Sequence, residues 1–294
     1  MPFVISNNVK IIVLIVTYNP NIKAFKETLR CVVNTAEKVL IIDNASKNLS
    51  EINDLTSQFK NISIIKNEKN LGISKPYNTA ISFARENNYD ALLLLDQDSI
   101  LCDNFVSEYR KHFSDQYVCL APLIAHRSKE YMEFVGDYFA EQKGAPPCEV
   151  ASTINSGTLI NLKNLPSQIH FDESLFIDWI DTDFFLQVQK SGLKTLRINT
   201  ATLLADIGDF KKHKMLNRVW FSSNYSPQRL LFQAKDTAYF FKKYYKEKNP
   251  FFKTHEYVTI TLWRWLMMAI FEKKRLRKIT SLIKGLAAGI LGNV

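Results

Sequence analysis

The chain has 294 residues, enough for one large hydrophobic core or for a main domain with a helical extension. Apolar residues make up 46% and charged residues 23%, which excludes the disordered and fibrous classes. The formal net charge is +9, and its C-terminal clustering favours an anionic surface as partner over a bland scatter of lysines. No apolar run reaches the ~18–20 residues that span a bilayer, and no secretion signal opens the sequence, so we expect neither export nor membrane crossing.

The cysteines are widely spaced and are not accompanied by a histidine cluster; they are Cys31, Cys102, Cys119 and Cys148. This pattern argues against a zinc site and a disulfide framework, and predicts reduced thiols in a cytosolic protein.

The first hundred residues alternate strands and helices. Short β-branched and apolar runs predict buried strands at 11–16, 39–42, 62–65 and 91–95. Helical stretches are predicted at 22–35 and 48–59, and a loop leading into a helix at 72–87. Strands separated by helices of this length predict an α/β fold, a doubly wound and mostly parallel sheet with helices on both faces.

Polar motifs follow three of these strands: Thr17-Tyr18-Asn19, Asp43-Asn44 and Asp96-Gln97-Asp98. Each alone is compatible with ordinary turn chemistry, because Asn and Asp dominate turns. Ligands of open α/β sheets bind outside the carboxyl ends of the strands, so three polar ends on one edge favour a binding site. Two carboxylates at i and i+2 suit Mg²⁺ or Mn²⁺, which takes one or two carboxylates plus substrate phosphates.

An ordered set of motifs resembles the family-2 inverting glycosyltransferases of the GT-A fold. The motifs are Val16-Thr17-Tyr18-Asn19-Pro20, Ile41-Ile42-Asp43-Asn44-Ala45-Ser46, Asn70-Leu71-Gly72-Ile73 with Asn78, and Leu95-Asp96-Gln97-Asp98-Ser99. The first and last look most like the bacterial rhamnosyltransferase branch of O-antigen and polysaccharide assembly. The likeness runs through about residues 9–236.

The resemblance implies a role for each matched residue. The nucleotide pocket would be formed by Thr17, Tyr18, Asn19, Asp43, Asn70, Lys75, Asp96 and Arg229. Asp43 would accept a hydrogen bond from the pyrimidine, whose ring N3–H is a donor. Asp96 would face the ribose and the metal, and Asp98 would be the direct metal ligand.

The acidic segment 177–184 would supply the base that takes a proton from the acceptor hydroxyl in a single displacement. Its likeness to the family places that base at Asp181, while Asp178 and Trp179 are candidates for acceptor contact. Two alternatives stay open: the acids cap a helix and oppose its dipole, and Trp179 packs in the core.

Two departures from the family's pattern affect the metal and the diphosphate. Ala205 stands where the family often has a metal-binding His, so Asp206 is the candidate third ligand; the alternative is that the ion relies on Asp98, phosphate and water. Farther on, Tyr225 replaces a His before Ser-Pro, and Arg229 matches a basic residue that would pair with diphosphate; the alternative is an exposed cation on a helix.

We expect a GT-A catalytic domain over 1–225, with a nucleotide half (1–100) and an acceptor half (101–225), and a basic helical region over 226–294. Within that region, an apolar aromatic stretch at 257–271 precedes the basic cluster 273–278. This predicts peripheral attachment to the anionic inner face of a bacterial cell membrane. The alternative is that the apolar face packs on the catalytic domain.

The function expected is transfer of rhamnose from dTDP-rhamnose to a polyprenyl-diphosphate-linked glycan, with Mg²⁺ or Mn²⁺. Galactofuranosyl, glucosyl or other hexosyl transfer from a UDP-sugar is the first alternative, and sugar nucleotidyl transfer is a more distant one. A carbohydrate- or nucleic-acid-binding protein is the non-enzyme alternative, but basic patches interleaved with aromatics are confined to the tail, so we expect no nucleic-acid partner. The sequence does not indicate an oligomeric state.

Overall fold

The computed structural model describes residues 9–127, 132, 137, 139–205, 211–215, 218–222, 224–246 and 254–292. The chain divides into two compact units. Unit 1 comprises Met1–Asp172 and Asp181–Ala205, and unit 2 comprises Glu173–Ile180 and Asp206–Val294. The boundary thus falls after Ala205, and a short segment in the middle of the chain is grouped with the C-terminal residues.

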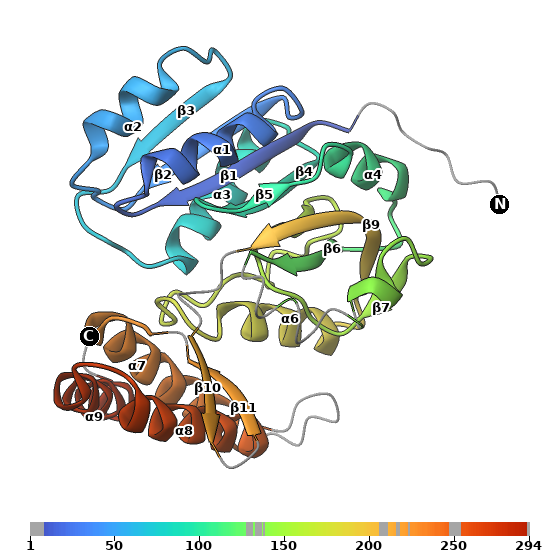
Figure 1. Cartoon of the computed structure of the whole chain (residues 1–294). Coiled ribbons are helices and arrows are strands. Elements are labelled where there is room, and N and C mark those ends of the chain that lie inside the picture. The colour runs from blue at the N-terminus through green and yellow to red at the C-terminus, as the bar shows by residue number, and fades with distance from the viewer. Residues whose placement is uncertain are drawn as a thin grey trace. The chain divides into compact units, whose positions relative to one another are not determined.

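The first half of unit 1 confirms the predicted alternation of strands and helices (Figure 1). Its strands are β1 (Ile11–Thr17), β2 (Lys38–Asp43), β3 (Ile62–Lys66) and β4 (Ala91–Asp96). Its helices are α1 (Ile22–Val32), α2 (Leu49–Thr56) and α3 (Ser74–Glu86). β2 pairs with β1 and with β3, and β1 also pairs with β4, all in parallel.

The second half of unit 1 extends the sheet with antiparallel as well as parallel pairs. Its strands are β5 (Ile100–Leu101), β6 (Cys119–His126), β7 (Cys148–Val150), β8 (Leu159–Asn161) and β9 (Thr195–Ala205). Its helices are α4 (Phe105–His112) and α6 (Ile180–Lys190). The strand order is β3-β2-β1-β4-β8-β6-β9-β5, with β7 on β9. β8 is antiparallel to β4 and β6, while β6 and β9 are parallel.

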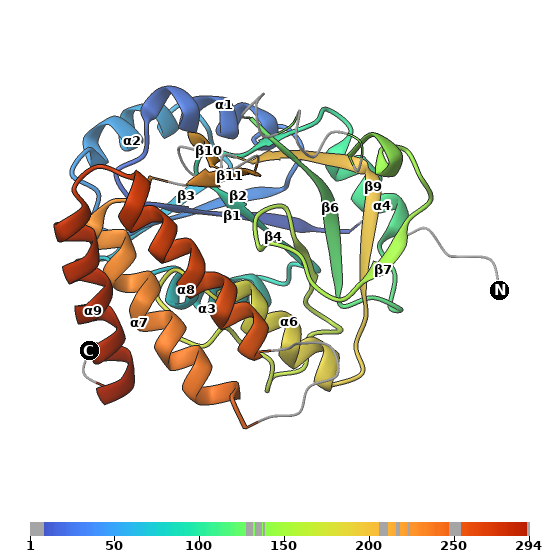
Figure 2. The same ribbon diagram turned by 60° about the horizontal axis from the view of Figure 1, so that its bottom comes forward.

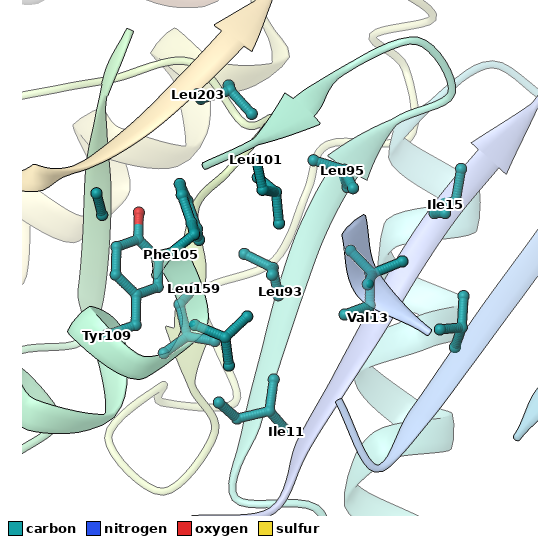
Figure 3. Close-up of a cluster of buried hydrophobic side chains, with 14 of the residues drawn as sticks. Ile11, Val13, Ile15, Leu93, Leu95, Leu101, Phe105, Tyr109, Leu159 and Leu203 are labelled. Carbon is teal, nitrogen blue, oxygen red and sulfur yellow. The ribbon is translucent and has the colours of Figure 1, made fainter. Parts of the chain in front are cut away.

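Successive side chains of each strand point to opposite sides of the sheet, and consecutive residues of β1, β2 and β4 are buried, so both faces are covered. Ile11, Val13 and Ile15 of β1 pack in one core cluster with side chains of α4 (Figure 3), and the cluster also includes side chains of α1 and α2. The intervening Ile12 and Leu14 are equally buried, on the face that α3 covers. The sequence prediction of a mostly parallel sheet with helices on both faces is confirmed for this unit.

The described residues of unit 2 form a hairpin and three long helices. The hairpin is β10 (Lys211–Met215) with β11 (Arg218–Ser222), paired antiparallel. The helices are α7 (Pro227–Tyr244), α8 (Thr254–Phe271) and α9 (Arg275–Leu291), and α7 and α9 pack side by side (Figure 2). Ser226 caps α7 by accepting a hydrogen bond from the N–H of Arg229, and Pro227 takes the first helical position, where its missing N–H costs nothing.

Within the described residues, no helix combines the length and the apolar composition needed to cross a bilayer. This includes α8, which carries the apolar aromatic stretch seen in the sequence.

Candidate active site

The carboxyl ends of β1, β2 and β4 lie next to one another. Thr17 pairs with Asp43 in the register of β1 and β2, and Val16 pairs with Asp96 in the register of β1 and β4. Because the strands are parallel, all three polar motifs leave the sheet at the same edge, as predicted.

A buried hydrogen-bond network joins the first two motifs. The Thr17 hydroxyl donates to Oδ1 of Asp43 at 2.8 Å, and the N–H of Ser46 donates to Oδ2 at 2.9 Å. The Ser46 hydroxyl in turn accepts from the N–H of Asn19 at 2.8 Å, and Asn19 Oδ1 accepts from the N–H of Lys47 at 2.8 Å. Asn19 has φ 46°, a conformation that Asn tolerates better than most residues, so the loop after β1 is held in a fixed turn.

The loop between β3 and α3 is fastened to β2 through Asn44. Its amide donates to the carbonyl of Gly72 at 2.7 Å, and its Oδ1 accepts from the Asn67 amide at 2.9 Å. Asn70 caps the same turn by accepting from the N–H of Gly72 at 2.9 Å. Lys75 follows on the first turn of α3, exposed to solvent. Asn70 and Lys75 thus sit on one ordered loop beside the strand edge.

Gln97 connects the acidic turn to the loop after β1. Its side-chain carbonyl accepts from the N–H of Tyr18 at 2.9 Å, and its backbone carbonyl accepts from the Thr28 hydroxyl at 3.1 Å. On the other side, the Ser156 hydroxyl accepts from the N–H of Asp96 at 3.0 Å and lies 2.9 Å from the Ser99 hydroxyl. The backbone that carries Asp96 and Asp98 is therefore held from two sides. Asp96 itself is exposed and Asp98 half-buried.

The candidate base, Asp181, lies on the first turn of α6. The N–H and hydroxyl of Thr182 both bond its Oδ1, at 2.8 and 3.5 Å. Loss of hydration raises the pKa of this carboxyl above its ordinary value, and the bonds from Thr182 only partly oppose that effect. Asp183, by contrast, is fully buried and accepts from the Gln187 amide at 2.7 Å, a structural arrangement within the helix.

The buried phenol of Tyr77, on α3, lies near both Asp96 and Asp181. Its side chain is 2% exposed and meets the ring of Phe171 edge-on, with centroids 4.8 Å apart. Burial raises the pKa of its phenol well above the ordinary value, and the negative charges of Asp96 and Asp181 raise it further. Both carboxylates therefore lie within electrostatic reach of one phenol, which places the acidic turn and the start of α6 around the same residue.

The family model for glycosyl transferase family 2 matches residues 12–163, more than half of the chain. The chain belongs to glycosyl transferase family 2. It is an enzyme of the glycosyltransferase class, as the sequence motifs predicted.

Relatives of this glycosyltransferase agree with that assignment. The dTDP-rhamnosyl transferase RfbF of Shigella flexneri is 24% identical over 211 residues, which cover 69% of this chain and 71% of that protein.

Solved structures show the fold. GalNAc-T7 with UDP, GalNAc and Mn²⁺ has a TM-score of 0.56 at 12% identity over 98% of this chain, which spans only 57% of that structure. S. aureus TarS 1-349 with UDP-GlcNAc has a TM-score of 0.53 at 15% identity, over 96% of this chain and 80% of that one. The predicted GT-A fold is confirmed.

The acidic turn of this family-2 glycosyltransferase fits a hard divalent cation whose other ligands come from substrate phosphates and water. Asp96 and Asp98 supply two carboxylates from one turn, and the described part of the chain contains no group of three or more His, Cys, Asp or Glu side chains that suits a metal ion. Ala205 ends β9 as a buried residue without donor atoms. Asp206, the candidate third ligand, lies outside the described residues.

The other sequence candidates belong to unit 2. Trp179 is 9% exposed, stacks on Phe240 with centroids 4.6 Å apart, and donates its indole N–H to the Thr237 hydroxyl at 2.9 Å. This is the packing alternative for Trp179 rather than stacking on an acceptor sugar. Asp178 is half-buried, and its Oδ1 accepts from the N–H of Trp179 at 3.2 Å. The guanidinium of Arg229 lies 4.5 Å from the centroid of the Tyr225 ring.

Several residues of the enzyme were missed by sequence reasoning. Gln97 and Ser156 hold the acidic turn by hydrogen bonds. The pKa of Tyr77 responds to the charges of both Asp96 and Asp181. Asp236 accepts hydrogen bonds from the segment before α6. Gln97 sits inside the acidic motif, so its position was a usable signal. The contacts of the other three depend on residues 19 to 104 positions away in the chain, which no local pattern indicates.

Unit 2 of the enzyme also contains a cavity of about 470 Å³. It is lined by His213, Ser222, Asn224, Tyr225, Ser226, Pro227, Phe271, Glu272, Lys273, Lys274 and Lys278. Lys278 and Glu272 form a buried ion pair, and Glu272 also accepts from the N–H of Asn224 at 3.0 Å. Lys273 and Lys274 are exposed, so the lining has a net positive charge beside the N-terminus of α7, an arrangement that suits an anionic group.

Proposed function

We propose that this glycosyltransferase is an inverting enzyme that moves rhamnose from dTDP-rhamnose to a hydroxyl of a lipid-linked glycan. One observation supports this proposal: the carboxylate of Asp96 at the acidic turn and the base candidate Asp181, whose pKa is raised, both lie within electrostatic reach of the Tyr77 phenol. Rhamnose as the sugar is supported by the likeness to a protein named as a dTDP-rhamnosyl transferase.

In this proposal, the donor nucleotide binds at the edge formed by β1, β2 and the loop before α3. The buried network of Thr17, Asp43 and Ser46 holds the carboxylate of Asp43 in place. Each oxygen of Asp43 keeps a second lone pair, which in this proposal accepts from the N3–H of the pyrimidine. Tyr18 and Asn19 on one side, with Asn70 and Lys75 on the other, complete the pocket. Arg229 is proposed to pair with the diphosphate.

Asp181 takes the proton from the acceptor hydroxyl as the acceptor oxygen attacks the anomeric carbon. The bond from that carbon to the diphosphate oxygen breaks in the same step, and the nucleoside diphosphate leaves with the electron pair. A carboxylate whose pKa is raised by loss of hydration is a stronger base than an ordinary aspartate, which suits this task.

Mg²⁺ or Mn²⁺, held by Asp96 and Asp98, would offset the charge that develops on the leaving diphosphate. Asp206 is proposed as a further ligand. The protein's own part is to fix the turn that carries these carboxylates, through Gln97 and Ser156.

The decisive experiment is a donor panel with the purified full chain, comparing dTDP-rhamnose with common UDP-sugars in Mg²⁺, in Mn²⁺ and in chelator. We expect turnover with dTDP-rhamnose that needs the divalent ion, and loss of that turnover in Asp98→Asn without loss of fold. A preference for a UDP-sugar would assign the enzyme to galactofuranosyl, glucosyl or other hexosyl transfer. Full activity in chelator would overturn the metal-dependent mechanism.

For the acceptor, we propose a polyprenyl-diphosphate-linked glycan presented at the anionic inner face of the bacterial cell membrane. Apolar side chains of α9 are exposed at Leu276 (80%), Ile283 (62%) and Ile290 (62%), seven residues apart and so on one side of the helix. The exposed Lys273 and Lys274, just before this helix, line the cavity of unit 2. An apolar stripe beside basic residues supports surface attachment, and a basic cavity supports binding of an anionic lipid headgroup.

A further inference from the structure

The segment 173–180 packs with the C-terminal residues of the chain and not with the residues that flank it in the sequence. It belongs to unit 2, although the residues before and after it belong to unit 1. Its last residue, Ile180, is the first of α6, and Asp181 follows at once. Whatever holds this segment therefore also sets the backbone from which the candidate base projects.

A single carboxylate oxygen holds the middle of the segment. Oδ2 of Asp236, on α7, accepts hydrogen bonds from the backbone N–H groups of Phe176 (3.0 Å), Ile177 (2.7 Å) and Asp178 (2.9 Å). Three consecutive amides directed at one atom form a small anion-binding nest. The Asp236 side chain is fully buried, and its Oδ1 has no hydrogen-bond partner. All hydrogen bonds that the Asp236 carboxylate accepts from described residues therefore come from these three amides.

The same face of α7 binds the two aromatic residues of the segment. Phe176 stacks on Phe232 with centroids 4.1 Å apart, and Trp179 stacks on Phe240 and bonds to Thr237. Phe232 and Phe240 lie four positions before and after Asp236, so all three project from one face of the helix. Together with the bonds to Asp236, these contacts cover the segment from Phe176 to Trp179.

The backbone between this anchor and α6 is strained. Trp179 has φ 63°, a left-handed conformation that a bulky residue adopts at a cost and keeps only when its surroundings fix it. It lies between Asp178, whose N–H is bound by Asp236, and Ile180, which begins the helix. The anchor and the helix together impose this turn.

We propose that Asp236 is a positioning residue for the proposed base, holding segment 176–178 so that the turn at Trp179 starts α6 with Asp181 correctly placed. The inference rests on the proposed function of Asp181. Asp236 acts through the backbone and touches no substrate. An oxygen acceptor at this position is what the arrangement requires, and a side chain of similar size without one leaves three buried N–H groups unsatisfied.

Three substitutions separate the acceptor from the charge and from the packing. Asp236→Asn keeps an oxygen for the three amides and removes the charge. Asp236→Leu has a similar shape and removes the acceptor, and Asp236→Glu keeps the carboxylate but displaces it by one methylene. Lys242→Gln, on an exposed position of α7, serves as a control that leaves the nest intact.

Amide hydrogen exchange of residues 176–178 tests the anchor without reference to activity. In the full chain we expect exchange about tenfold or more faster in Asp236→Leu, and near wild type in Asp236→Asn and Lys242→Gln. Unchanged protection in Asp236→Leu would overturn the anchor. If Asp236→Leu does not fold, Asp236→Glu gives the same comparison, with faster exchange expected and wild-type protection overturning it.

Kinetics test the positioning role. We expect kcat of Asp236→Leu to fall by about 100-fold, the cost of a small misplacement of a reacting group, with donor KM unchanged and Asp236→Asn within about threefold of wild type. Equal damage to kcat and donor KM, or an Asp236→Asn variant as slow as Asp236→Leu, would overturn the inference. The two proposals fail differently: full turnover in Asp181→Asn refutes the base, whereas an inactive Asp181→Asn beside a fully active Asp236→Leu refutes only the positioning.

Discussion

At the scale of single residues, burial does the chemical tuning of this glycosyltransferase. Loss of hydration raises the pKa of Asp181, because the charged form gives up water, and hydrogen bonds from Thr182 and from its own backbone N–H only partly replace it. The phenol of Tyr77 stays protonated for the same reason and for the two negative charges around it. A neutral hydrogen-bond donor thus lies near two carboxylates for which we propose different tasks.

Turnover should depend on the ionised form of Asp181. We expect kcat/KM to fall on the acid side with a midpoint above 3.8, the ordinary value for this carboxyl, because the folded protein raises its pKa. Asp181→Asn should lose about 10²–10⁴-fold in kcat while donor binding, measured by calorimetry, stays intact. The exposed Asp115→Asn is the control and should match wild type. A pH profile identical in Asp181→Asn and wild type would count against the assignment.

The pH dependence of the free energy of unfolding should reveal the titration of Asp236. Burial raises the pKa of its carboxyl from 3.8 to about 6, and the three amide bonds only partly oppose this. A raised folded-state pKa means that this group's contribution to stability is fully present below about pH 4 and is lost as pH rises through about 6. The shift corresponds to about 3 kcal/mol.

Urea unfolding of wild type and Asp236→Asn between pH 4 and 8 measures this directly. As pH falls from about 7 to about 4, the free energy of unfolding of wild type should increase relative to that of Asp236→Asn, because only the wild type takes up a proton at this position. Parallel stability curves would show that Asp236 does not titrate in this range.

Sequence reasoning located individual side chains better than it located their partners. The strand-end residues were predictable because strand ends and parallel register follow from local patterns, and Thr17, Asp43 and Asp96 do leave one edge. The packing of Trp179 was not predictable, because it depends on Thr237 and Phe240, about 60 residues away in the chain. Such pairings are fixed by tertiary packing and carry no local signal.

At the scale of elements, β-branched and apolar runs identified the parallel half of the sheet to within about one residue at each end. Helix ends were less predictable: α1 stops at Val32 rather than at 35, where a turn closes with the N–H of Thr35 bonded to the carbonyl of Val32. The short strand β5 lacks a periodic signal of its own, because two residues are too few to show an alternating pattern.

Close packing of α7 and α9 depends on two glycines of α9. A Cβ on Gly285 would lie 2.2 Å from the carbonyl oxygen of Leu231, and one on Gly289 would lie 2.4 Å from that of Lys235. Ala234 and Ala238 face the same positions, 2.7 Å from each added Cβ. The helices therefore meet through their backbones.

Gly285→Ala tests this contact, because two effects oppose each other. Helix propensity alone would stabilise by about 1 kcal/mol. The clash requires the helices to move apart, and overpacking of this kind costs about 1–3 kcal/mol, more where the obstacle is backbone. We expect net destabilisation and a lower Tm by calorimetry, whereas Ala287→Val, on an exposed position of α9, should change Tm little. A more stable Gly285→Ala would mean that the contact is looser than described.

At the scale of the whole molecule, the net charge of +9 and the exposed apolar side of α9 predict binding to anionic lipid. Flotation with phosphatidylglycerol vesicles should recover the wild-type chain, and neutral phosphatidylcholine vesicles should recover less. Replacing Leu276, Ile283 and Ile290 together by Gln should reduce flotation at every salt concentration. Lys273→Gln with Lys274→Gln should reduce it chiefly at low salt, by about 1 kcal/mol for each charge. Undiminished flotation of both variants would rule out this surface.

The grouping of 173–180 with the C-terminal residues has a consequence for engineering. A chimera that joins the first 205 residues of this enzyme to the tail of a relative would leave the backbone amides of 176–178 facing a foreign helix. Grafts aimed at new acceptors must therefore carry the internal octapeptide and the C-terminal helices as one cassette, inserted at two places in the chain.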